Sequence, residues 1–323
     1  MTNDINTLSA QINERLEAVN YGKAPSTLYD PIRYIMSLGG KRLRPILVLL
    51  SYKLFHDDAE NVIDQALAVE VFHNFTLMHD DIMDEAPLRR GKATVHEKWN
   101  SSTAILSGDV MLVRAYEMLL DAKGDLKSIL SAFNACAAGV CEGQQFDMDF
   151  EQEEQVSEAE YLKMIQLKTA VLLGFSLQLG AMLAETDQKT TDTLYRMGVD
   201  FGIGFQLKDD LLDVYGDQEK FGKQVGGDII ANKKTFLLLK AIELASEQQR
   251  KELEKWLNTD ADPKAKVEAV TALYDQLNIK ALTLQKMNEY FDKGLLALQR
   301  LSIEEERKRS LQDFIQYLIQ REQ

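Results

Sequence analysis

Proline is scarce in this chain of 323 residues: there are five, and none lies between Pro87 and Pro263. Helix interiors exclude proline, because it removes a backbone hydrogen bond and its ring clashes with the preceding turn. The sequence also lacks alternating β-branched segments bounded by Asn-Gly or Asp-Gly turns, which are typical of hairpins. These two absences favour helices and predict an all-α fold.

Basic residues are also fewer than acidic ones, 37 against 51, so that the formal net charge is −14 at pH 7. A nucleic-acid-binding surface needs an excess of lysine and arginine to meet the phosphate backbone, so nucleic acid is excluded as a partner. The two cysteines, Cys136 and Cys141, lie five residues apart in a helical stretch, where they are poorly placed for a disulfide. We expect both to be small buried side chains in a reducing compartment.

Targeting and membrane segments are missing from the pattern as well. The first residues, MTNDINTLSAQ, are polar and lack the basic start and apolar centre of a signal peptide. The most apolar expected helix, residues 171–184, is interrupted by Ser176 and Gln178 and is too short to span a bilayer. We therefore expect a cytoplasmic protein with no membrane insertion.

Apolar residues recur at helical spacing through almost the whole chain. The clearest break is the segment 216–232, which is rich in glycine and charge. No short repeat is present, and we predict one domain over residues 1–323. Helices are expected at residues 5–20, 28–38, 43–55, 62–84, 101–121, 125–148, 158–184, 187–215 and 233–245, followed by exposed amphipathic helices from 246 onward.

Two aspartate clusters share the pattern DDxxD, at residues 80–84 and 209–213. Their first and last carboxylates are four residues apart and project from one helix face, where like charges destabilise an isolated helix by roughly 0.2–0.5 kcal/mol. Three carboxylates therefore need a cation, and Mg²⁺ takes carboxylates, waters and substrate phosphates. Because apolar residues precede each cluster, we predict that the two helices face each other across one cavity. The predicted metal ligands are Asp80, Asp81, Asp84, Asp209, Asp210 and Asp213.

Two basic clusters supply partners for a phosphate. Lys41 and Arg44 lie one turn apart behind Gly39-Gly40, and Arg89-Arg90 follow the first aspartate cluster by one short loop. Arginine binds oxyanions through two parallel hydrogen bonds, and lysine acts as a compact charge. In so acidic a chain, basic clusters beside glycines indicate an anion site.

Other polar residues interrupt apolar helices, where a buried polar group needs a partner. His73 lies two turns before Asp80 on the same helix face, which is compatible either with a core histidine or with a ligand role. The segments Gly143-Gln144-Gln145-Phe146-Asp147 and Lys168-Thr169 are further interruptions of this kind. A bound ligand is one of several partners that could satisfy them.

Together these motifs resemble the trans-isoprenyl diphosphate synthases, the farnesyl and geranylgeranyl diphosphate synthase family. The resemblance covers residues 35 to 240 and rests on GGKxxRP, both aspartate motifs, the paired arginines, GQxxD, KT and the GKxxGGD loop, in that order. It implies antiparallel helices around a deep central cavity, usually in a homodimer. It also implies a magnesium-dependent prenyltransferase, a transferase of alkyl groups other than methyl, with three Mg²⁺ ions at its site.

The resemblance assigns roles to residues by their place in the motifs. Asp80, Asp84 and Asp209 would ligate magnesium, with Asp81, Asp210 and Asp213 assisting. Arg89, Lys168, Lys223 and Lys233 would hold the allylic diphosphate. Lys41, Arg44, His73 and Arg90 would hold the diphosphate of isopentenyl diphosphate. Gln144, Thr169 and Gln206 would line the reacting carbons, with Asp147 orienting Lys168.

The implied reaction begins with ionisation of the allylic C–O bond, as cations stabilise the departing diphosphate. The double bond of isopentenyl diphosphate attacks the resulting cation, and the released diphosphate takes the proton. The starter would be dimethylallyl, geranyl or farnesyl diphosphate, and segment 216–232 would close over it as a lid. Two alternatives remain: a class I terpene cyclase, which would normally lack GGKxxRP, and a non-catalytic subunit of a prenyltransferase, which would tend to lose an aspartate motif.

The resemblance also points to two residues that set product length. Phe75 and Thr76 lie five and four positions before Asp80, one helical turn deeper. A large side chain there would stop the growing chain, although Phe75 could instead serve core packing. The small Thr76 leaves room beside the ring, so we favour geranylgeranyl diphosphate, and farnesyl diphosphate stays open.

Overall fold

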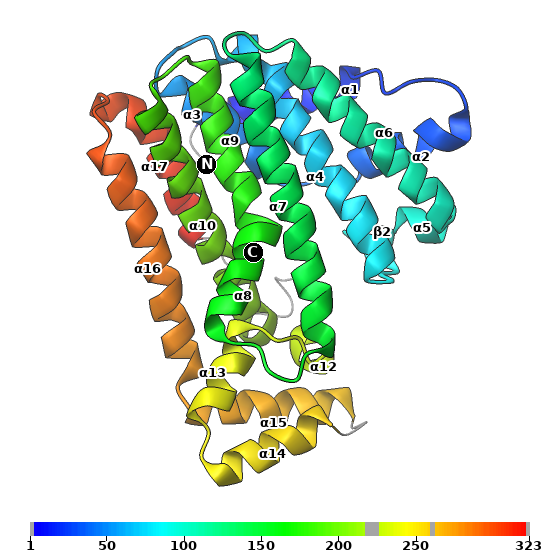
Figure 1. The fold of residues 1–323 in the computed structure, drawn as a ribbon, viewed down its shortest axis with the longest axis vertical. Coiled ribbons are helices and arrows are strands. Elements are labelled where there is room, and N and C mark those ends of the chain that lie inside the picture. Colours follow the sequence, from blue (N-terminus) through cyan, green and yellow to red (C-terminus); the bar gives the residue numbers. More distant parts are fainter. Residues whose placement is uncertain (1–2, 217–225, 259–261, 321–323) are drawn as a thin grey trace. The chain divides into compact units, whose positions relative to one another are not determined.

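The computed structural model describes residues 3–216, 226–258 and 262–320, and helices dominate it (Figure 1). The all-α prediction is confirmed. The elements are α1 (Asn3–Ala18), α2 (Ser26–Ser37), α3 (Leu43–Lys53), η1 (Ala59–Val62), α4 (Ile63–Met83), β1 (Leu88–Arg89), β2 (Lys92–Ala93), α5 (Val95–Lys98), α6 (Ser101–Leu120), α7 (Leu126–Gln152), α8 (Glu158–Ile165), η2 (Gln166–Ala170), α9 (Val171–Leu183), α10 (Gln188–Tyr215), α12 (Gly227–Ile230), α13 (Phe236–Leu244), α14 (Glu247–Leu257), α15 (Pro263–Gln276), α16 (Ile279–Arg300) and α17 (Glu305–Gln320).

Several helices begin after a serine, asparagine or aspartate whose side chain caps the first turn, a signal that the sequence itself contains. Ser157 begins α8 and Ser246 begins α14, each with a capping box in which the serine and the residue three positions later satisfy each other's backbone N–H. Asn100 accepts from the N–H of Thr103 at the start of α6. Asp262 does the same for α15, where Pro263 occupies the first turn.

The structure differs from the expected elements in several short segments, among them the four-residue helix α5, which no expected element covers. The predicted loop at 86–93 contains an antiparallel hairpin of two short strands, β1 and β2. The expected helix 158–184 is interrupted by η2, a turn of π-helix. The expected break after residue 216 contains α12, whose four residues were too few to produce a periodic signal.

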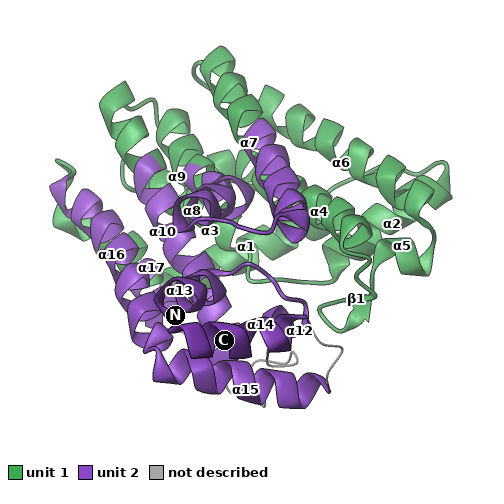
Figure 2. Ribbon diagram, turned by 60° about the horizontal axis from the view of Figure 1, so that its bottom comes forward, with its two compact units in different colours: residues 1–136, 175–195, 301–314 green, residues 137–174, 196–300, 315–323 purple. Residues whose placement is uncertain are grey.

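The chain divides into two compact units, coloured green and purple in Figure 2. Unit 1 comprises residues 1–136, 175–195 and 301–314, and unit 2 comprises residues 137–174, 196–300 and 315–323. The division falls within α7, α9, α10 and α17. The prediction of a single domain, like that of a deep cavity, stays a prediction.

Helix α4 is the central element of unit 1. It packs against α1, α2, α3, α5 and α6, so residues on all its faces are buried, including Phe72 and Glu70. The ring of Phe72 meets Phe133 edge-on at a centroid distance of 5.1 Å, and Phe133 meets Phe175 at 5.6 Å. This aromatic core fixes α4, and therefore the residues that it carries.

Unit 2 is built around a core shared by α10, α12, α13, α14, α15 and α16, with Leu237, Val270 and Ile279 fully buried. The start of α8 is tied to this unit by charge. Glu158 pairs with Lys240 of α13 at 2.7 Å and with Lys286 of α16 at 2.9 Å. One carboxylate thus fixes the helix that leads into η2.

The two cysteines differ in burial. Cys136 is buried as predicted, and burial raises the pKa of its thiol. Cys141 is exposed, which corrects the expectation that both cysteines are buried, because it falls on the outer face of α7.

Within the described residues, one helical run, Glu158–Leu183, is apolar enough to cross a membrane by composition, and 78% of its apolar window is buried in the protein.

Candidate active site

The first aspartate cluster lies at the C-terminal end of α4, in unit 1. Asp80 is half-buried, Asp81 is 2% exposed, and Asp84 is exposed and forms the C-cap of the helix. The last turn of α4 carries no basic residue. A helix C-terminus has negative dipole character, which disfavours each nearby carboxylate by roughly 0.3–1 kcal/mol. This donor set therefore suits a cation.

Asp81 is turned toward Arg89. Its two oxygens accept from Arg89 Nε at 2.8 and 2.9 Å, and Arg89 Nη2 lies 2.6 Å from Oδ1. Burial raises the pKa of Asp81, and the hydrogen bond from Arg89 opposes that rise. Arg89 lies on the hairpin strand β1, and its Nη2 atom is 3.7 Å from Oδ2 of Asp80. Asp81 thus fixes an arginine beside Asp80, and its part in metal binding stays a prediction.

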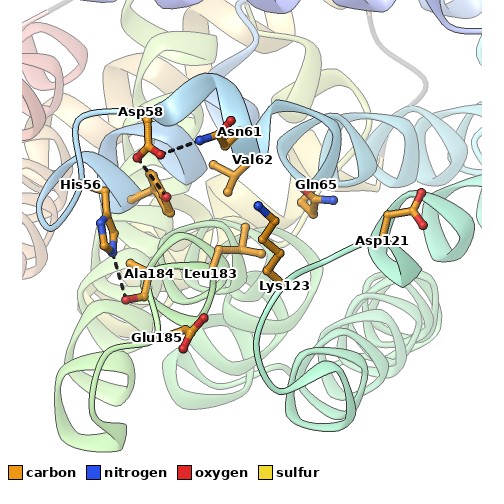
Figure 3. Close-up of a pocket in the computed structure, with 11 residues that line it drawn as sticks. His56, Asp58, Asn61, Val62, Gln65, Asp121, Lys123, Leu183, Ala184 and Glu185 are labelled. Atoms are coloured by element: carbon orange, nitrogen blue, oxygen red, sulfur yellow. Dashed lines mark hydrogen bonds between the residues drawn. The ribbon is translucent and has the colours of Figure 1, made fainter.

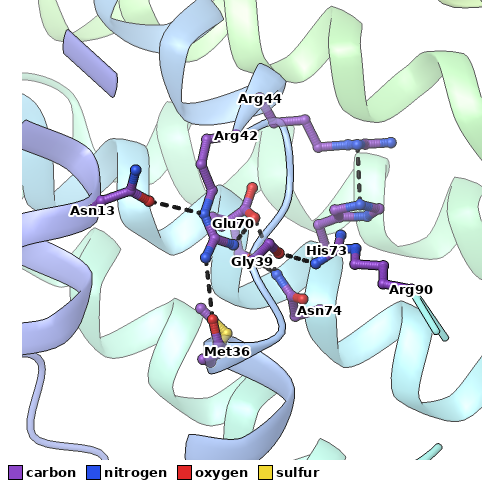
Figure 4. Close-up of polar contacts among 9 residues, drawn as sticks. All are labelled: Asn13, Met36, Gly39, Arg42, Arg44, Glu70, His73, Asn74 and Arg90. Atoms are coloured by element: carbon purple, nitrogen blue, oxygen red, sulfur yellow. Dashed lines mark hydrogen bonds and ion pairs between the residues drawn. The ribbon is translucent and has the colours of Figure 1, made fainter. Parts of the chain in front are cut away.

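The Gly39-Gly40 turn carries the second basic group of unit 1. Gly39 and Gly40 have φ values of +78° and +140°, which favour glycine. Arg90 donates from Nη1 to the carbonyl of Gly39 (Figure 4). A Cβ on Gly40 would lie 2.9 Å from Arg90 Nη2, so this glycine leaves the space that the guanidinium occupies.

Arg44, on the first turn of α3, reaches His73 on α4. Arg44 Nη1 lies 3.1 Å from His73 Nε2 (Figure 4). Burial, followed by the nearby arginines, lowers the pKa of His73 well below its ordinary value, so the ring is neutral and Nε2 accepts from Arg44. Burial lowers the pKa of Arg44 to about 10, which leaves it charged at pH 7. Lys41, three residues before Arg44, is exposed.

The sequence analysis missed Arg42 and Glu70, which form an ion pair inside unit 1. Arg42 Nη1 lies 2.6 Å from Glu70 Oε1, and the two side chains are 5% and 3% exposed. A charge within the apolar run ALAVEVF of residues 66–72 was the available signal. Charged groups are almost never fully buried unless paired, so Glu70 required a cation somewhere in the chain.

The second aspartate cluster lies in the last two turns of α10, in unit 2. Asp209 is exposed, Asp210 is 4% exposed, and Asp213 is half-buried. The Oδ2 atom of Asp213 accepts from the N–H of Asp228 at 2.9 Å, and its carbonyl accepts from the N–H of Gly226 at 2.6 Å. The described part of the GKxxGGD motif is therefore folded onto the aspartate cluster.

Asp210 begins a chain of hydrogen bonds that leads away from the cluster. Tyr161 donates to its Oδ2 atom, and Gln206 Nε2 donates to Oδ1 at 3.0 Å. Thr169 Oγ1 then donates to Gln206 Oε1 at 3.1 Å. Burial raises the pKa of Asp210 to about 7, and the hydrogen bond from Tyr161 opposes that rise. Asp210 thus orients Gln206 and Thr169, and the sequence analysis missed Tyr161 as its partner.

Lys168 and Thr169 lie on the π-helical turn η2. The predicted pairing of Lys168 with Asp147 is present, with Nζ 2.5 Å from Oδ2. A Cβ on Gly143 of α7 would collide with the backbone of Lys168. The glycine of the GQxxD motif thus permits close contact between α7 and η2. Gln144 Nε2, next to it, is buried and has no hydrogen-bond partner among the described residues, which leaves a donor for a ligand.

Two lysines were predicted to hold the allylic diphosphate from the segment after α10. Lys223 lies outside the described residues, as does most of the predicted lid, and both stay predictions. Lys233 is exposed, and its backbone N–H donates to the carbonyl of Asp228 at 2.9 Å. Residues Gly226–Lys233, which follow the undescribed part of this segment, are therefore held to the second aspartate cluster by backbone hydrogen bonds.

The two predicted chain-length residues differ in their surroundings. Phe75 is 8% exposed and packs against Phe72 at 5.6 Å and His79 at 4.8 Å between ring centroids. Thr76 is half-buried and donates to the carbonyl of His73 at 2.8 Å. Phe75 thus belongs to the aromatic core of unit 1, and its role in chain length stays a prediction.

No group of three or more acidic, histidine or cysteine side chains that could hold a metal occurs among residues 3–216, 226–258 and 262–320. Magnesium commonly takes only one or two carboxylates and completes its shell with water and substrate phosphate. Asp80 with Asp84, and Asp209 at the end of α10, suit that mode of binding.

A pocket of about 350 Å³ lies elsewhere in unit 1 (Figure 3). Some of its polar groups contact one another: Asp58 accepts from Tyr52 and Asn61, and His56 Nε2 lies 3.4 Å from the carbonyl of Ala184. None of the residues predicted to bind substrate or metal lines it. It is separate from the candidate site.

Comparisons with known proteins identify the family to which the chain belongs. The polyprenyl synthetase family model matches residues 25–275. A geranylgeranyl pyrophosphate synthase of Geoglobus acetivorans is 43% identical over 72% of this chain and 73% of its own, and a geranylgeranyl diphosphate synthase of Saccharolobus solfataricus is 35% identical over 98% and 96%. A crystal structure of geranylgeranyl pyrophosphate synthase superposes with a TM-score of 0.94 at 45% identity, covering 99% of both chains. The chain therefore belongs to the polyprenyl synthetase family and is a prenyltransferase.

Proposed function

We propose that this prenyltransferase condenses isopentenyl diphosphate with an allylic diphosphate and releases an all-trans short-chain prenyl diphosphate. One observation carries the proposal. Helix α4 bears both His73, which Arg44 contacts, and the Asp80 cluster, seven residues later. Seven residues of helix rise about 10 Å, so an anion site and a carboxylate site for cations lie within one substrate length.

The carboxylates at the end of α4 fit magnesium. They are hard oxygen donors at the negative end of a helix, and Asp84 is open to solvent. Asp80, Asp84 and Asp209 would hold the ions, whereas Asp81, Asp210 and Asp213 would act through the partners described above. When bound, Mg²⁺ supplies charge stabilisation to the departing diphosphate.

The remaining work falls to side chains of this protein. Arg89, Lys168 and Lys233, together with Lys223, bind the allylic diphosphate and favour its departure. Lys41, Arg44, His73 and Arg90 hold isopentenyl diphosphate so that its double bond attacks the allylic cation once the C–O bond has broken. The hydroxyl and amide oxygens of Thr169 and Gln206 face the positive charge. The proton lost from the new chain passes to the released diphosphate.

The product that we propose is geranylgeranyl diphosphate. Two relatives that share 43% and 35% identity with the chain carry that name, and Phe75 offers a ring at the depth where a chain would stop. Thr76 is small enough to leave room beside the ring. Farnesyl diphosphate, the shorter product, is the alternative that the experiment below separates.

A homodimer in the cytoplasm completes the proposal. Leu106, Val113 and Leu120 recur every seven residues on α6 and are 58%, 56% and 53% exposed. Seven residues are two helical turns, so the three side chains form one apolar stripe. A stripe of this kind would be covered by the same helix of a second copy.

The test is incubation of the purified protein with isopentenyl diphosphate, Mg²⁺ and, separately, dimethylallyl, geranyl or farnesyl diphosphate. After phosphatase treatment, chromatography of the prenyl alcohols gives product length. We expect geranylgeraniol from each starter and no product without a starter or with EDTA. Farnesol as the end product would correct the length. Failure to consume isopentenyl diphosphate with any starter would contradict the proposed reaction.

A further inference from the structure

We propose that the buried ion pair Arg42–Glu70 positions the groups that bind isopentenyl diphosphate. The inference rests on the function proposed above for Lys41, Arg44 and Arg90, and it adds two residues that touch no substrate themselves. Arg42 and Glu70 are 6% and 2% exposed as whole residues. They are positioning residues, because they act through their neighbours.

Arg42 connects three other helices to the start of α3. Its Nη1 donates to Glu70 Oε1 of α4 at 2.6 Å, and its Nη2 donates to the carbonyl of Met36 in α2 at 3.1 Å. Its Nε lies 3.4 Å from Asn13 Oδ1 of α1 (Figure 4). The planar fork of a guanidinium can serve partners in several directions at once, and a lysine cannot.

The backbone of Arg42 needs this support. Arg42 is the N-cap of α3 and has φ +50° and ψ +34°, in the left-handed region, which is unfavourable for a residue with a Cβ. The pairing with Glu70 holds the residue in that conformation. Since Gly39 and Gly40 come just before Arg42 and Arg44 two residues after it, the geometry of Arg42 determines where both basic groups lie.

On each side of Arg42 along the chain, a residue contacts a group that we propose binds substrate. Upstream of Arg42, the carbonyl of Gly39 accepts from Arg90. Downstream, Arg44 reaches His73, which lies three residues after Glu70 on the same face of α4. A shift of the Arg42 backbone would therefore displace Arg44 and Arg90 together.

A role in stability alone explains this pair poorly. Replacing a buried ion pair by apolar side chains is often neutral or stabilising, because burying two charges is costly. The surrounding network is also incompletely satisfied, since the Tyr21 hydroxyl and Asn74 Oδ1 are buried without a hydrogen-bond partner in the described structure. Such an arrangement is retained where it orients something else, here the Gly39–Arg44 loop.

Arg42→Lys and Glu70→Gln separate positioning from charge. Arg42→Lys keeps the charge and removes the fork, whereas Glu70→Gln keeps the shape and removes one negative charge near the anion site. If the pair acted through charge alone, Glu70→Gln would lower KM for isopentenyl diphosphate. If it positions the loop, both variants raise that KM, by about five- to tenfold, with KM for the allylic diphosphate changed less than about twofold.

Two control variants show whether a loss of protein stability by itself changes the KM values. Ser51→Ala removes a buried hydrogen bond to the carbonyl of Leu177 near the far end of α3, and Asp64→Asn breaks the exposed α1–α4 ion pair with Arg15. Both should leave the two KM values unchanged even where Tm falls. The KM values are measured with wild type and all four variants, and Tm by calorimetry.

The outcomes are distinct. A rise in KM for isopentenyl diphosphate alone, in both variants, supports the inference. Equal changes in both KM values, or a lowered KM in Glu70→Gln, overturn it. If either variant fails to fold, the other still decides. If wild type shows no turnover, the proposed function fails, and equilibrium binding of inorganic pyrophosphate to wild type and Arg42→Lys then tests the positioning role: unchanged affinity would reject it.

Discussion

The guanidinium of Arg90 occupies the space in front of Gly40, with Nη2 2.9 Å from the position that a Cβ would take. The glycines of the GGK motif therefore have a partner in Arg90, one of the paired arginines some fifty residues later. Gly39 supplies a carbonyl to Arg90, and Gly40 supplies room for it. Two motifs that lie far apart in the sequence thus come together in the predicted anion-binding site.

Gly40→Ala is expected to displace Arg90 and raise KM for isopentenyl diphosphate by about tenfold, as loss of one charge-assisted contact would. Gly39→Ala is the matched control, because Gly39 also has a positive φ and yet has open space where its Cβ would lie. Steady-state kinetics of both variants check this. Equal effects would show that backbone strain, and not the guanidinium, sets the KM.

Gly143→Ala is expected to destabilise the protein by about 1–3 kcal/mol, because the added methyl group meets the backbone of η2 at Lys168. It should also lower kcat, since Lys168 moves away from Asp147. Gly139→Ala, one turn earlier on α7, meets only the side chains of Leu167 and Val171 at 3.4 Å or more and should be neutral or stabilising. Thermal unfolding and kcat are measured together. Similar losses in the two variants would refute the close-approach argument.

Asp80→Ala and Asp209→Ala are expected to lower turnover by at least about 10²–10³-fold while far-UV circular dichroism stays unchanged. Both residues are partly or fully accessible to a cation, and neither is needed by the core. Asp64→Asn on the same helix α4 should retain activity. Near-normal turnover in either alanine variant would remove that residue from the metal site.

Phe75→Ala is expected to lengthen the product, since a buried ring is lost at the depth where the chain would stop. The variant should also lose about 3–5 kcal/mol of stability if its neighbours do not relax, because Phe72 and His79 pack on the ring. Chromatography of the prenyl alcohols gives the length. An unchanged length at lowered Tm would assign Phe75 to core packing alone.

Val113→Asp is expected to convert a dimer into monomers, because it places a charge at the centre of the α6 stripe. Light scattering coupled to gel filtration gives the mass. Leu296→Asp, another exposed apolar residue, on α16, is the control and should leave the mass unchanged. A wild-type monomer at micromolar concentration would contradict the proposed homodimer.

Periodicity predicted the long helices closely, because their apolar faces repeat over many turns. The predicted helix 62–84 corresponds to α4, Ile63–Met83, and the aspartates fall at its end as expected. Short elements were missed, since α5 and α12 have four residues each and a single turn carries no periodic signal. The hairpin at 88–93 is likewise too short to show alternation.

Motifs pointed to candidate ligand-binding residues better than to the residues that support them. Asp80, Arg89 and Lys168 could be assigned from spacing and resemblance. Their partners could not, because Asp210–Tyr161 and Arg42–Glu70 join residues far apart in sequence through contacts that only the fold brings about. A buried acidic residue in an apolar run shows that a partner exists and does not identify it.

The π turn η2 has one residue more than an α-helical path would need. Everything after it on the chain is rotated by about 100° about the helix axis relative to an uninterrupted helix. Deleting one residue from Gln166–Ala170 would therefore leave a regular α-helical path between α8 and α9, with their apolar faces still matched, but would move Lys168 or Thr169 off its face. The π turn thus changes the direction of Lys168 and Thr169 without altering the packing of α8 or α9, and Gly143 and Gly202 leave the space that its wider backbone needs.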